Sequence, residues 1–286
     1  MNGAFVETMK MIKIEHSVFA LPFALVSAFF AADGVPEPKT LLLIVAAMVF
    51  ARSSAMAFNR YLDADLDAKN PRTAVRSIPA GRLTRVYALG FTLLSAAGFM
   101  ICAGFLNNLA LLLSPLVLLV LLGYSYTKRF TRYCHFVLGV SLGLAPLGAW
   151  VAVTGSLAML PLWLGFAVIG WVAGFDIIYA CQDIGFDRDE RLFSIPAAIG
   201  LNRSLVLARL LHLGMVLVLG FIGTTHELGA LYWIGVGLVA LCLVYEHSLV
   251  WDGSLDRVDM AFFTMNGVVS LVFGGTTIAS ILIMGL

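Results

Sequence analysis

The stretch "NRYLDADLDAKNPRTAVRSIPAG", residues 59–81, decides the fold because it puts dense charge directly after an almost uncharged apolar segment. It contains three aspartates, three arginines and one lysine, whereas residues 41–58 before it carry Arg52 as their one charged residue. An apolar run of about 20 residues is long enough to cross the hydrocarbon core of a bilayer. The pattern therefore predicts a membrane-spanning helix that ends in a charged segment at the membrane edge.

The composition extends this prediction to the whole chain. Of its 286 residues, 60% are hydrophobic and 12% are charged, and the mean hydropathy is +0.95. Soluble domains carry about 25% charged residues. The apolar segments are continuous rather than alternating, which argues against a β-barrel. We expect an all-α, polytopic membrane helical bundle that forms one integral-membrane domain over residues 1–286. The nine expected spans are 17–32, 41–59, 86–106, 109–126, 135–154, 160–181, 204–224, 229–248 and 262–285.

The basic residues predict how the bundle is oriented. Lysines and arginines gather before the first span and in alternate loops, whereas the loops on the other side carry Lys39 alone. The positive-inside rule then places the N-terminus and the charged loops in the cytoplasm, in an inner or cytoplasmic membrane. The formal net charge of +1 gives no reason to expect a nucleic-acid partner, and the four scattered cysteines form no CxxC pair that would suggest a disulfide framework or a zinc site.

A second acidic stretch echoes the first one. Asp183 and Asp187 follow Asp63 and Asp67 at an offset of 120 residues (183 minus 63), and "SIPAAIG" at 194–200 repeats "SIPAG" at 77–81. The echo predicts two pseudo-repeated halves, each of which presents an acidic helix end on the same side of the membrane.

Helical spacing puts the acidic side chains of each stretch on one face. Residues four apart advance by about 400°, so Asn59, Asp63 and Asp67 drift by about 40° per step. The same arithmetic groups Asp183 with Asp187, and it places Asp176 two turns earlier on that stripe. Carboxylates in the hydrocarbon are costly, at about 2.5–3.5 kcal/mol each at a span centre, and like charges repel. Mg²⁺ offsets both costs, since it commonly bridges carboxylates to substrate phosphates.

Basic residues lie beside both acidic stretches. Arg72 and Arg76 follow the first motif, and Lys128 follows Tyr124 by one turn in "YSYTKR". Guanidinium and ammonium groups are suitable donors to phosphate oxygens. A diphosphate head at the mouth of an apolar bundle indicates an isoprenyl diphosphate whose tail lies among the spans. Metal and cations would stabilise the departing pyrophosphate, and aromatic faces would shield the allylic cation. The candidate aromatic residues are Tyr124, Tyr126, Phe175 and Tyr179.

These motifs resemble those of the UbiA-type membrane prenyltransferases. The stretch 59–81 is similar to the family's first aspartate-rich motif, NDxxDxxxD with an RTxxRxxPxG-like tail; "DIIYACQDIGFDRDE" looks like the second motif, and "YSYTK" like the YxxxK element. The resemblance covers essentially the full chain and implies Mg²⁺-dependent transfer of a prenyl group from polyprenyl diphosphate to an aromatic acceptor. The implied metal-binding residues are Asn59, Asp63, Asp67, Asp183 and Asp187. The four aspartates with Lys128 and Tyr124 are the implied catalytic residues, and Arg52, Asn59, Arg72, Arg76 and Asp176 the expected substrate-binding residues.

One departure from the family pattern concerns the first metal site. Arg60 stands where the family usually has an aspartate, and an arginine cannot bind a metal ion. The variant looks most like the 4-hydroxybenzoate polyprenyltransferase branch, some members of which are thought to serve a menaquinone route through a dihydroxynaphthoate. In that branch an arginine at the spacing of Arg52 is associated with the acceptor carboxylate. The expected acceptor is therefore a carboxylated precursor of ubiquinone or menaquinone, with haem B or 1,4-dihydroxy-2-naphthoate as alternatives.

A secondary transporter is the main alternative from another class, because internal repeats and intramembrane acids also suit transporters. Transport sites, however, lie near the midplane, whereas these acids gather at one face beside basic residues. An intramembrane aspartyl protease would need two aspartates that share a proton at depth. Glu15 and His16 receive no role, and Asn266 could either form a helix contact or line the cavity.

Overall fold

The structure is a computed structural model that describes residues 2–13, 19–251 and 253–284. Glu15 and His16 lie outside the described residues, as do the first residues of the expected span 17–32 and the last residue of the span 262–285. Within the described part, every regular element is a helix, so the all-α prediction is confirmed.

Twelve α-helices and two short non-α turns follow one another along the described chain. Their bounds are α1 (Asn2–Ile12), α2 (Leu21–Ala31), α3 (Pro38–Lys69), α4 (Arg85–Leu106), α5 (Asn108–Thr127), α6 (Cys134–Thr154), α7 (Met159–Ala180), the 3₁₀ turn η2 (Cys181–Asp183), α8 (Ile184–Asp189), α9 (Ile195–Ile199), α10 (Leu201–Thr225), α11 (Ala230–Ser248), the π-helical turn η3 (Met260–Met265) and α12 (Asn266–Met284).

The expected spans agree with these helices to within a few residues, apart from the end of α3. Eight of the described helical segments are long and apolar enough to cross a membrane. The remaining expected span, 17–32, corresponds to the shorter apolar helix α2, which has 11 residues. Helix α3 has 32 residues and continues ten residues past the expected end of the span at 59, as the helical spacing through Asp67 requires. Its extension carries the first acidic motif out of the apolar segment.

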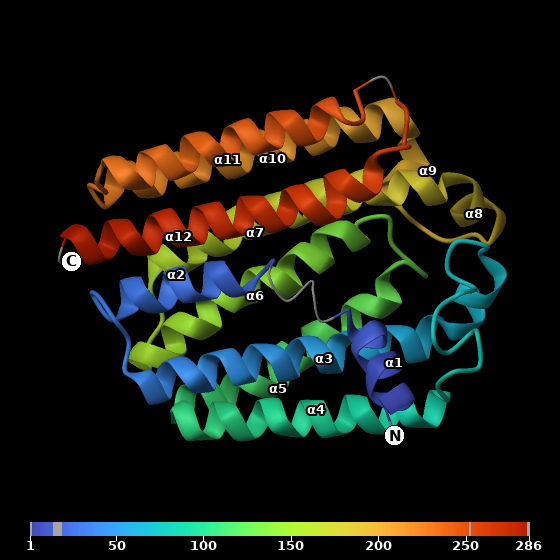
Figure 1. The fold of residues 1–286 in the computed structure, drawn as a ribbon, viewed down its shortest axis with the longest axis horizontal. Helices are drawn as coiled ribbons and strands as arrows, with labels where there is room; N and C mark the ends of the chain where they lie inside the picture. Colours follow the sequence, from blue (N-terminus) through green and yellow to red (C-terminus); the bar gives the residue numbers. More distant parts are fainter. Residues whose placement is uncertain (1, 14–18, 252, 285–286) are drawn as a thin grey trace.

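The long helices run side by side along the longest axis of the molecule (Figure 1). The segment after α3 lies at one end of the bundle together with α8 and α9, and the C-terminus lies at the other end (Figure 1). The short helix α1 packs against α3 near the first of these ends. Both acidic stretches therefore belong to the same end of the bundle, as the sequence predicts.

Glycines let α6 and α7 approach each other closely. A Cβ atom on Gly139 would lie 2.8 Å from the backbone oxygen of Ile169, and one on Gly143 would lie 2.9 Å from the backbone oxygen of Gly165. Small residues at such crossings bring two backbones into van der Waals contact, which is a main source of helix association in membranes. This packing fixes α7, the helix that carries the second acidic motif, against its neighbour.

Asn266 forms a helix contact, which decides between its two expected roles. Its side-chain oxygen accepts a hydrogen bond of 2.7 Å from Trp171 Nε1, and its amide nitrogen donates to the backbone oxygens of Ala261 and Phe262 at 3.3 and 2.9 Å. Trp171 and Asn266 are fully buried. The amide therefore ties the π-helical turn η3 to α7 at the centre of the bundle, and π-turns are frequent near functional sites.

Candidate active site

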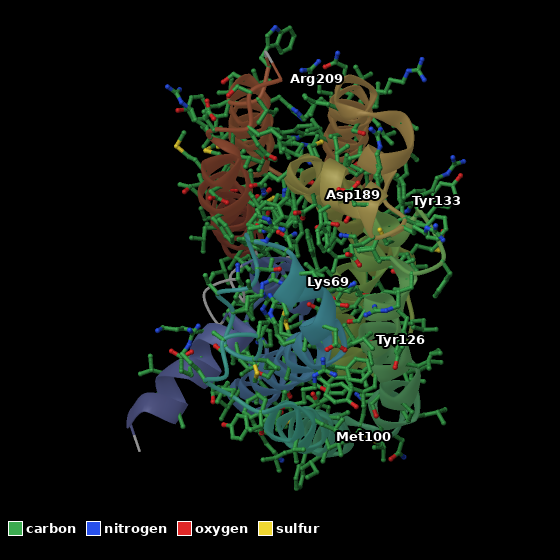
Figure 2. The ribbon with its side chains drawn as sticks, turned by 90° about the vertical axis from the view of Figure 1, so that its right-hand side faces the viewer. Lys69, Met100, Tyr126, Tyr133, Asp189 and Arg209 are labelled. Atoms are coloured by element: carbon green, nitrogen blue, oxygen red, sulfur yellow. The ribbon has the colours of Figure 1, made fainter. Side chains whose placement is uncertain are left out.

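The two acidic helix ends meet through side chains of the segment that follows α3. Asn70 donates to Asp183 at 3.1 Å, and Arg72 donates to both carboxylate oxygens of Asp183 at 3.2 and 2.5 Å. Lys69 forms an ion pair with Glu190 at 2.6 Å. Figure 2 looks at this end of the bundle, and Lys69 and Asp189 lie near its centre. The expected convergence of the two acidic stretches is therefore present.

The first motif lies on one uninterrupted helix. Because α3 continues to Lys69, Asn59 and Asp63 stand one turn apart on one face, and the Asn59 amide donates to Asp63 at 2.9 Å. Asp65 points elsewhere and forms an ion pair with Arg85 near the protein surface. The helix stops at Asn70, whose backbone is extended, because the proline that follows disfavours the helical conformation of the residue before it.

The second motif does not lie on one continuous helix, which corrects the predicted stripe. Helix α7 ends at Ala180, and the 3₁₀ turn η2 separates it from α8. A 3₁₀ turn has about 3.0 residues per turn rather than 3.6, so it changes the angular spacing on which the prediction relied. Asp183 and Asp187 are buried, with exposed fractions of 9% and 0%.

Asp176 bonds to a histidine rather than to the basic residues of the acidic end. Its carboxylate lies 2.6 Å from His135 Nδ1, and the other ring nitrogen of His135 accepts a hydrogen bond of 3.3 Å from the backbone of Ile195. Nδ1 is the ring nitrogen that faces the Asp176 carboxylate and can donate to it. The structure thus places Asp176 in a link between α6, α7 and α9.

Each of the four motif aspartates forms one close ion pair with a basic side chain, and Asp67 has Arg60 as a second, more distant partner. The four nitrogen–oxygen distances lie between 2.5 and 2.8 Å, so every carboxylate is neutralised by its own cation. Buried carboxylates need such partners because an unpaired buried charge is strongly destabilising. The pairs are Arg129 Nη2 with Asp63 Oδ1 at 2.8 Å, Arg76 Nη1 with Asp67 Oδ1 at 2.6 Å, Arg72 Nη2 with Asp183 Oδ2 at 2.5 Å, and Lys128 Nζ with Asp187 Oδ1 at 2.7 Å.

These pairs keep the cations of the site charged. Burial by itself lowers the pKa of Lys128, but the Asp187 carboxylate outweighs burial, so the pKa of Lys128 is raised. Burial likewise lowers the pKa of Arg72, and the hydrogen bonds from Arg72 to Asp183 outweigh it and raise that pKa. Both groups are therefore cations at neutral pH and can exchange a carboxylate oxygen for a phosphate oxygen without a proton transfer.

The remaining predicted residues lie on the Asp63 side of the site. Tyr124 is partly buried in the last turn of α5, and Ser125 next to it accepts a hydrogen bond of 3.4 Å from Asn59. Arg52 lies on α3, two turns before Asn59 and within the apolar part of the helix. Arg52, the candidate for binding the acceptor carboxylate, thus lies on the same helix as Asn59, and Tyr124 of the YxxxK element lies next to a hydrogen-bond partner of Asn59.

Sequence reasoning missed several partners of the aspartates. The sequence analysis gives no site role to Arg129, which directly follows Lys128 and donates to Asp63, or to Asn70 of "KNPRT", which donates to Asp183. Ser194, in the repeated "SIPAAIG", donates to Asp187 at 2.7 Å. Arg60 is buried, with Nη1 at 3.3 Å from Asn59 Oδ1 and 3.9 Å from Asp67 Oδ2. Adjacency to a motif residue was the signal that could have identified these side chains.

The acidic end offers the ligand atoms that Mg²⁺ prefers. Among the residues that the structure describes, no three His, Cys, Asp or Glu side chains are gathered closely enough to hold a metal ion, and cations contact the motif carboxylates. Asp67 Oδ2, however, is buried and accepts no hydrogen bond from the described residues. A donor set of carboxylate and amide oxygens is the one Mg²⁺ uses. The residues therefore fit Mg²⁺, provided that the arginine and lysine side chains now paired with the aspartates move to other partners.

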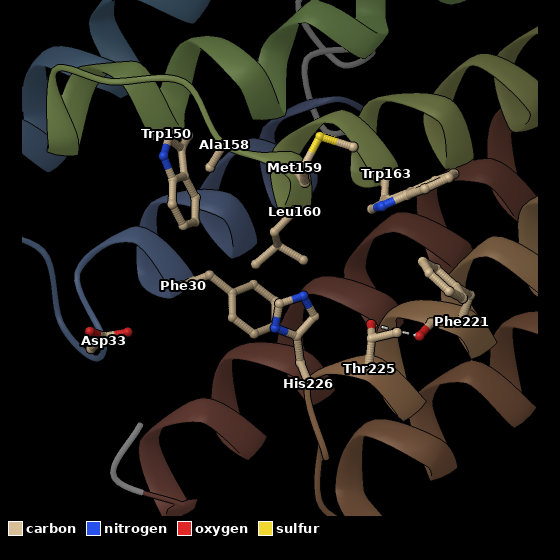
Figure 3. A pocket seen from close by; sticks show the side chains of 10 residues that line it. All are labelled: Phe30, Asp33, Trp150, Ala158, Met159, Leu160, Trp163, Phe221, Thr225 and His226. Carbon is tan, nitrogen blue, oxygen red and sulfur yellow. Dashed lines mark hydrogen bonds between the residues drawn. The ribbon is translucent and has the colours of Figure 1, made fainter.

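One pocket lies at the other end of the bundle. It has a volume of about 430 Å³ and is lined mostly by aromatic and aliphatic side chains, among them Phe30, Trp150 and Trp163 (Figure 3). Asp33 and His226 are its two ionisable lining residues, and it contains none of the predicted site residues. Tryptophans at such a level are typical of the aromatic belt of membrane proteins. The acidic end, rather than this pocket, is the candidate active site.

Known proteins are similar to this chain over most of its length. The model of the UbiA prenyltransferase family matches residues 20–268. A 4-hydroxybenzoate octaprenyltransferase of Tolumonas auensis is 33% identical over 249 residues, which cover 87% of this chain and 87% of that protein. The one of Photobacterium profundum is 30% identical, with 88% and 87% covered.

Solved structures share the fold. A UbiA homolog from Aeropyrum pernix K1, solved in the apo state, superposes with a TM-score of 0.86 at 35% identity and covers 93% of this chain and 98% of its own. A UbiA homolog from Archaeoglobus fulgidus bound to DMAPP and Mg²⁺ superposes with a TM-score of 0.74 at 20% identity, covering 96% and 99%.

Proposed function

Because this chain belongs to the UbiA prenyltransferase family, we propose that it transfers a polyprenyl group from polyprenyl diphosphate to a carboxylated aromatic quinone precursor. Membership makes the chain an alkyl-transferring enzyme and disfavours the transporter alternative. The observation that carries the proposal is the set of four aspartates, each in close contact with a cation, at one end of an apolar bundle. The proposed acceptor is 4-hydroxybenzoate or a dihydroxynaphthoate, for ubiquinone or menaquinone biosynthesis.

The ion pairs suggest how the donor head would bind. The four motif aspartates and Asn59 would hold Mg²⁺ on the two helix ends, and bound Mg²⁺ would neutralise charge on the leaving diphosphate. Arg72, Arg76 and Lys128 would then move from their carboxylates to phosphate oxygens. Such an exchange keeps every buried charge paired, which avoids the penalty for an isolated ion in the membrane.

The proposed transfer is a substitution that needs neither an oxidant nor a reductant. The bond between the first prenyl carbon and the diphosphate oxygen breaks, and its electron pair leaves with the diphosphate. An electron-rich ring carbon of the acceptor supplies the pair for the new carbon–carbon bond, and the ring then releases its proton. Tyr124 and Tyr179 offer aromatic faces that would stabilise the positive charge on the prenyl carbon. Arg72 lies 5.1 Å from the Tyr179 ring and also donates to its hydroxyl, which orients that ring.

Arg52 supports a carboxylated acceptor. An arginine in the apolar part of a membrane helix is costly and is a functional candidate by default. Its place on α3, two turns before Asn59, would put an acceptor carboxylate deeper than the diphosphate. We further propose that residues 1–286 form one prenyltransferase domain whose acidic end faces the cytoplasm, in an inner or cytoplasmic membrane, since the basic residues gather at that end.

The test is an acceptor panel with purified protein in liposomes, Mg²⁺ and a radiolabelled polyprenyl diphosphate. The four acceptors, offered in parallel, are 4-hydroxybenzoate, 1,4-dihydroxy-6-naphthoate, 1,4-dihydroxy-2-naphthoate and haem B. Labelled product with a carboxylated phenol or naphthol, dependent on Mg²⁺, is the expected result. Product with haem B alone would refute the carboxylate argument, and no product with any acceptor would refute the proposed function.

A further inference from the structure

His135 joins three helices around the second acidic motif. It lies at the start of α6, its Nδ1 is 2.6 Å from the Asp176 carboxylate of α7, and its Nε2 accepts a hydrogen bond of 3.3 Å from the backbone N–H of Ile195. Ile195 is the first residue of α9, where a backbone N–H has no partner within its own helix. His135 has an exposed fraction of 2%, so a buried side chain supplies the missing partner.

The residue before Ile195 contacts the acidic motif directly. Ser194 donates a hydrogen bond of 2.7 Å to Asp187 Oδ2, and its Oγ accepts one of 3.2 Å from the backbone of Ala197. The hydroxyl therefore has a fixed position at the N-cap of α9 and a fixed direction toward the carboxylate. Ser194 and Asp187 have exposed fractions of 1% and 0%, so this contact is closed to the protein surface.

Ser194 lies between two anchored residues. On one side, the backbone N–H of Phe193 donates to the backbone oxygen of Lys128 at 2.8 Å, and on the other side Ile195 donates to His135. The first anchor consists of main-chain atoms, whereas the second depends on a side chain. His135 thus holds the segment 193–195 in the place from which Ser194 reaches Asp187.

Asp176 in turn limits the rotation of the imidazole. Among residues 171–180 of α7, Asp176 and Tyr179 are the two that are not buried, and a spacing of three puts them on one face of the helix. The Tyr179 hydroxyl accepts a hydrogen bond from Arg72, which also binds Asp183. The carboxylate that orients His135 therefore lies on the face of α7 that borders the acidic end.

We propose that His135 is a positioning residue of the active site: through Ile195 and Ser194, it orients the Asp187 carboxylate for a divalent metal ion that binds together with diphosphate. Hydrogen bonds from behind a metal-binding carboxylate hold it in the orientation that binds the metal. This inference rests on the proposed binding of Mg²⁺ and diphosphate at the acidic end. In this role, His135 itself touches neither the metal nor the substrate.

The two oxygens of Asp187 have different partners, which gives the proposed orientation a purpose. Ser194 holds Oδ2, whereas Oδ1 forms the ion pair of 2.7 Å with Lys128 Nζ. When Lys128 moves to a phosphate oxygen, Oδ1 is the oxygen that becomes available to a metal ion. A carboxylate that is held at Oδ2 cannot rotate freely at that moment, so its Oδ1 keeps its direction.

The experiment measures binding of radiolabelled pyrophosphate to the intact protein in phosphatidylcholine nanodiscs. Binding in the presence of EDTA is subtracted from binding in the presence of Mg²⁺, and the difference is the Mg²⁺-dependent binding. This measurement needs neither an acceptor nor turnover. The Kd of wild type is then compared with the Kd of each variant.

Two polar substitutions separate the two contacts of His135. An asparagine amide reaches about as far as Nδ1 and can still bond to Asp176, whereas a glutamine amide reaches about as far as Nε2 and can still accept from Ile195. We expect His135→Asn to raise the Kd about tenfold, the lower end of the losses typical of groups behind metal ligands, and His135→Gln to stay within about threefold of wild type. Equal losses in the two variants, or unchanged binding in His135→Asn, would overturn the proposal.

His212→Asn is the matched control. His212 has the same exposed fraction of 2%, and its ring also contacts two partners, the backbone oxygen of Trp171 and the ring of His247. None of these residues belongs to the acidic motifs, so His212→Asn should leave the Kd for pyrophosphate unchanged. A loss as large as that of His135→Asn would show that a general loosening of the bundle is responsible, and the proposal would fail.

Ser194→Ala tests the route from His135 to Asp187. The double variant of His135→Asn and Ser194→Ala should bind pyrophosphate about as weakly as Ser194→Ala alone, because effects that pass through one group do not add. Losses that multiply in the double variant would overturn this route. In turnover assays, His135→Asn should raise the KM for polyprenyl diphosphate and leave the KM for the acceptor unchanged.

Failure of this inference and failure of the proposed function are distinguishable. Absence of Mg²⁺-dependent pyrophosphate binding in the wild-type protein would overturn the inference. Absence of product in the acceptor panel would refute the proposed transfer, but it would leave the comparison of pyrophosphate binding among the variants intact.

Discussion

Arg72 donates hydrogen bonds from two nitrogen atoms to the carboxylate of Asp183, although the two residues are 111 positions apart in the chain. Its Nε donates to Oδ1 at 3.2 Å and its Nη2 to Oδ2 at 2.5 Å, while Nη1 donates to the Tyr179 hydroxyl at 2.9 Å. This side chain joins the tail of the first acidic motif to the start of the second. The Arg72 guanidinium thus connects the two helix ends. A bound diphosphate would compete with the Asp183 carboxylate for the same guanidinium nitrogens.

Removal of the Asp63 charge should abolish most of the turnover. Asp63→Asn is expected to lower the rate of product formation by at least about tenfold, because losses of 10–100-fold are typical even for groups behind the metal ligands. Asp65→Asn is the matched control: its side chain is 80% exposed against 23% for Asp63, and it should stay within about twofold of wild type. Initial rates with saturating donor provide the measurement. Equal effects of the two substitutions would contradict a metal-binding role for Asp63.

Arg72→Lys should weaken donor binding although it keeps the charge. Lysine cannot reproduce the two-point contact with a carboxylate or a phosphate, so the KM for polyprenyl diphosphate should rise by about tenfold while the KM for the acceptor is unchanged. Arg188→Lys is a suitable control, because the exposed Arg188 donates to the backbone of Ala197 instead of a motif aspartate. An unchanged donor KM in Arg72→Lys would show that this arginine does not contact the diphosphate.

Arg52→Met should affect the acceptor and not the donor. Methionine keeps an unbranched apolar stem and removes the charge, and a hydrogen bond to a charged group contributes about 1.5–3 kcal/mol. The KM for 4-hydroxybenzoate should therefore rise by about tenfold or more. In the wild type, the KM for 4-hydroxybenzamide, which has no carboxylate, should be higher than the KM for 4-hydroxybenzoate. In the variant, the two KM values should be similar. A uniform loss for both acceptors would argue for a structural role of Arg52.

Asn266→Leu should destabilise the bundle centre. It removes the acceptor of the Trp171 indole N–H and the donor to the backbone oxygens of Ala261 and Phe262. A buried polar group left unsatisfied costs about 1–3 kcal/mol, so the Tm in detergent should fall by several degrees. Asn202→Leu, at an exposed position near the start of α10, provides the control and should leave Tm nearly unchanged. Equal Tm values for Asn266→Leu and wild type would show that the amide does not hold the π-helical turn.

Docking of α1 should persist to low pH. Hydrogen bonds from Arg82, then Ser77 and Lys10, lower the pKa of Glu7 from its ordinary 4.5 to about 2. Because the pKa is lower in the folded state, the stabilisation is fully present above the ordinary value and is lost as the pH falls through about 2. Amide-exchange protection of residues 4–12, compared between wild type and Glu7→Gln, should differ at pH 6 and converge near pH 2. The same difference at both pH values would exclude the Glu7 carboxylate as the titrating group.

The sequence predicted most of the membrane architecture because that information is local. Apolar runs of sufficient length gave the helices, and four-residue spacing correctly placed Asn59, Asp63 and Asp67 on one face of α3. The same reasoning does not carry over to Asp176, Asp183 and Asp187, because it assumes that the helix continues from α7 into α8, whereas the 3₁₀ turn η2 interrupts it. Helical spacing predicts which residues share a face only within one continuous helix. The residues "YACQDIG" around the 3₁₀ turn contain no clear signal that the helix is interrupted there.

The sequence by itself determined which residues are acidic and basic, which segments are apolar, and that both acidic stretches end spans on the same side. Only the tertiary structure decided which cation neutralises which aspartate. Arg129 reaches Asp63 over 66 residues and Arg72 reaches Asp183 over 111, so neither pair follows from the repeat of a single helix. The physical reason is that a buried charge selects the nearest opposite charge in space, and packing between distant helices sets that distance.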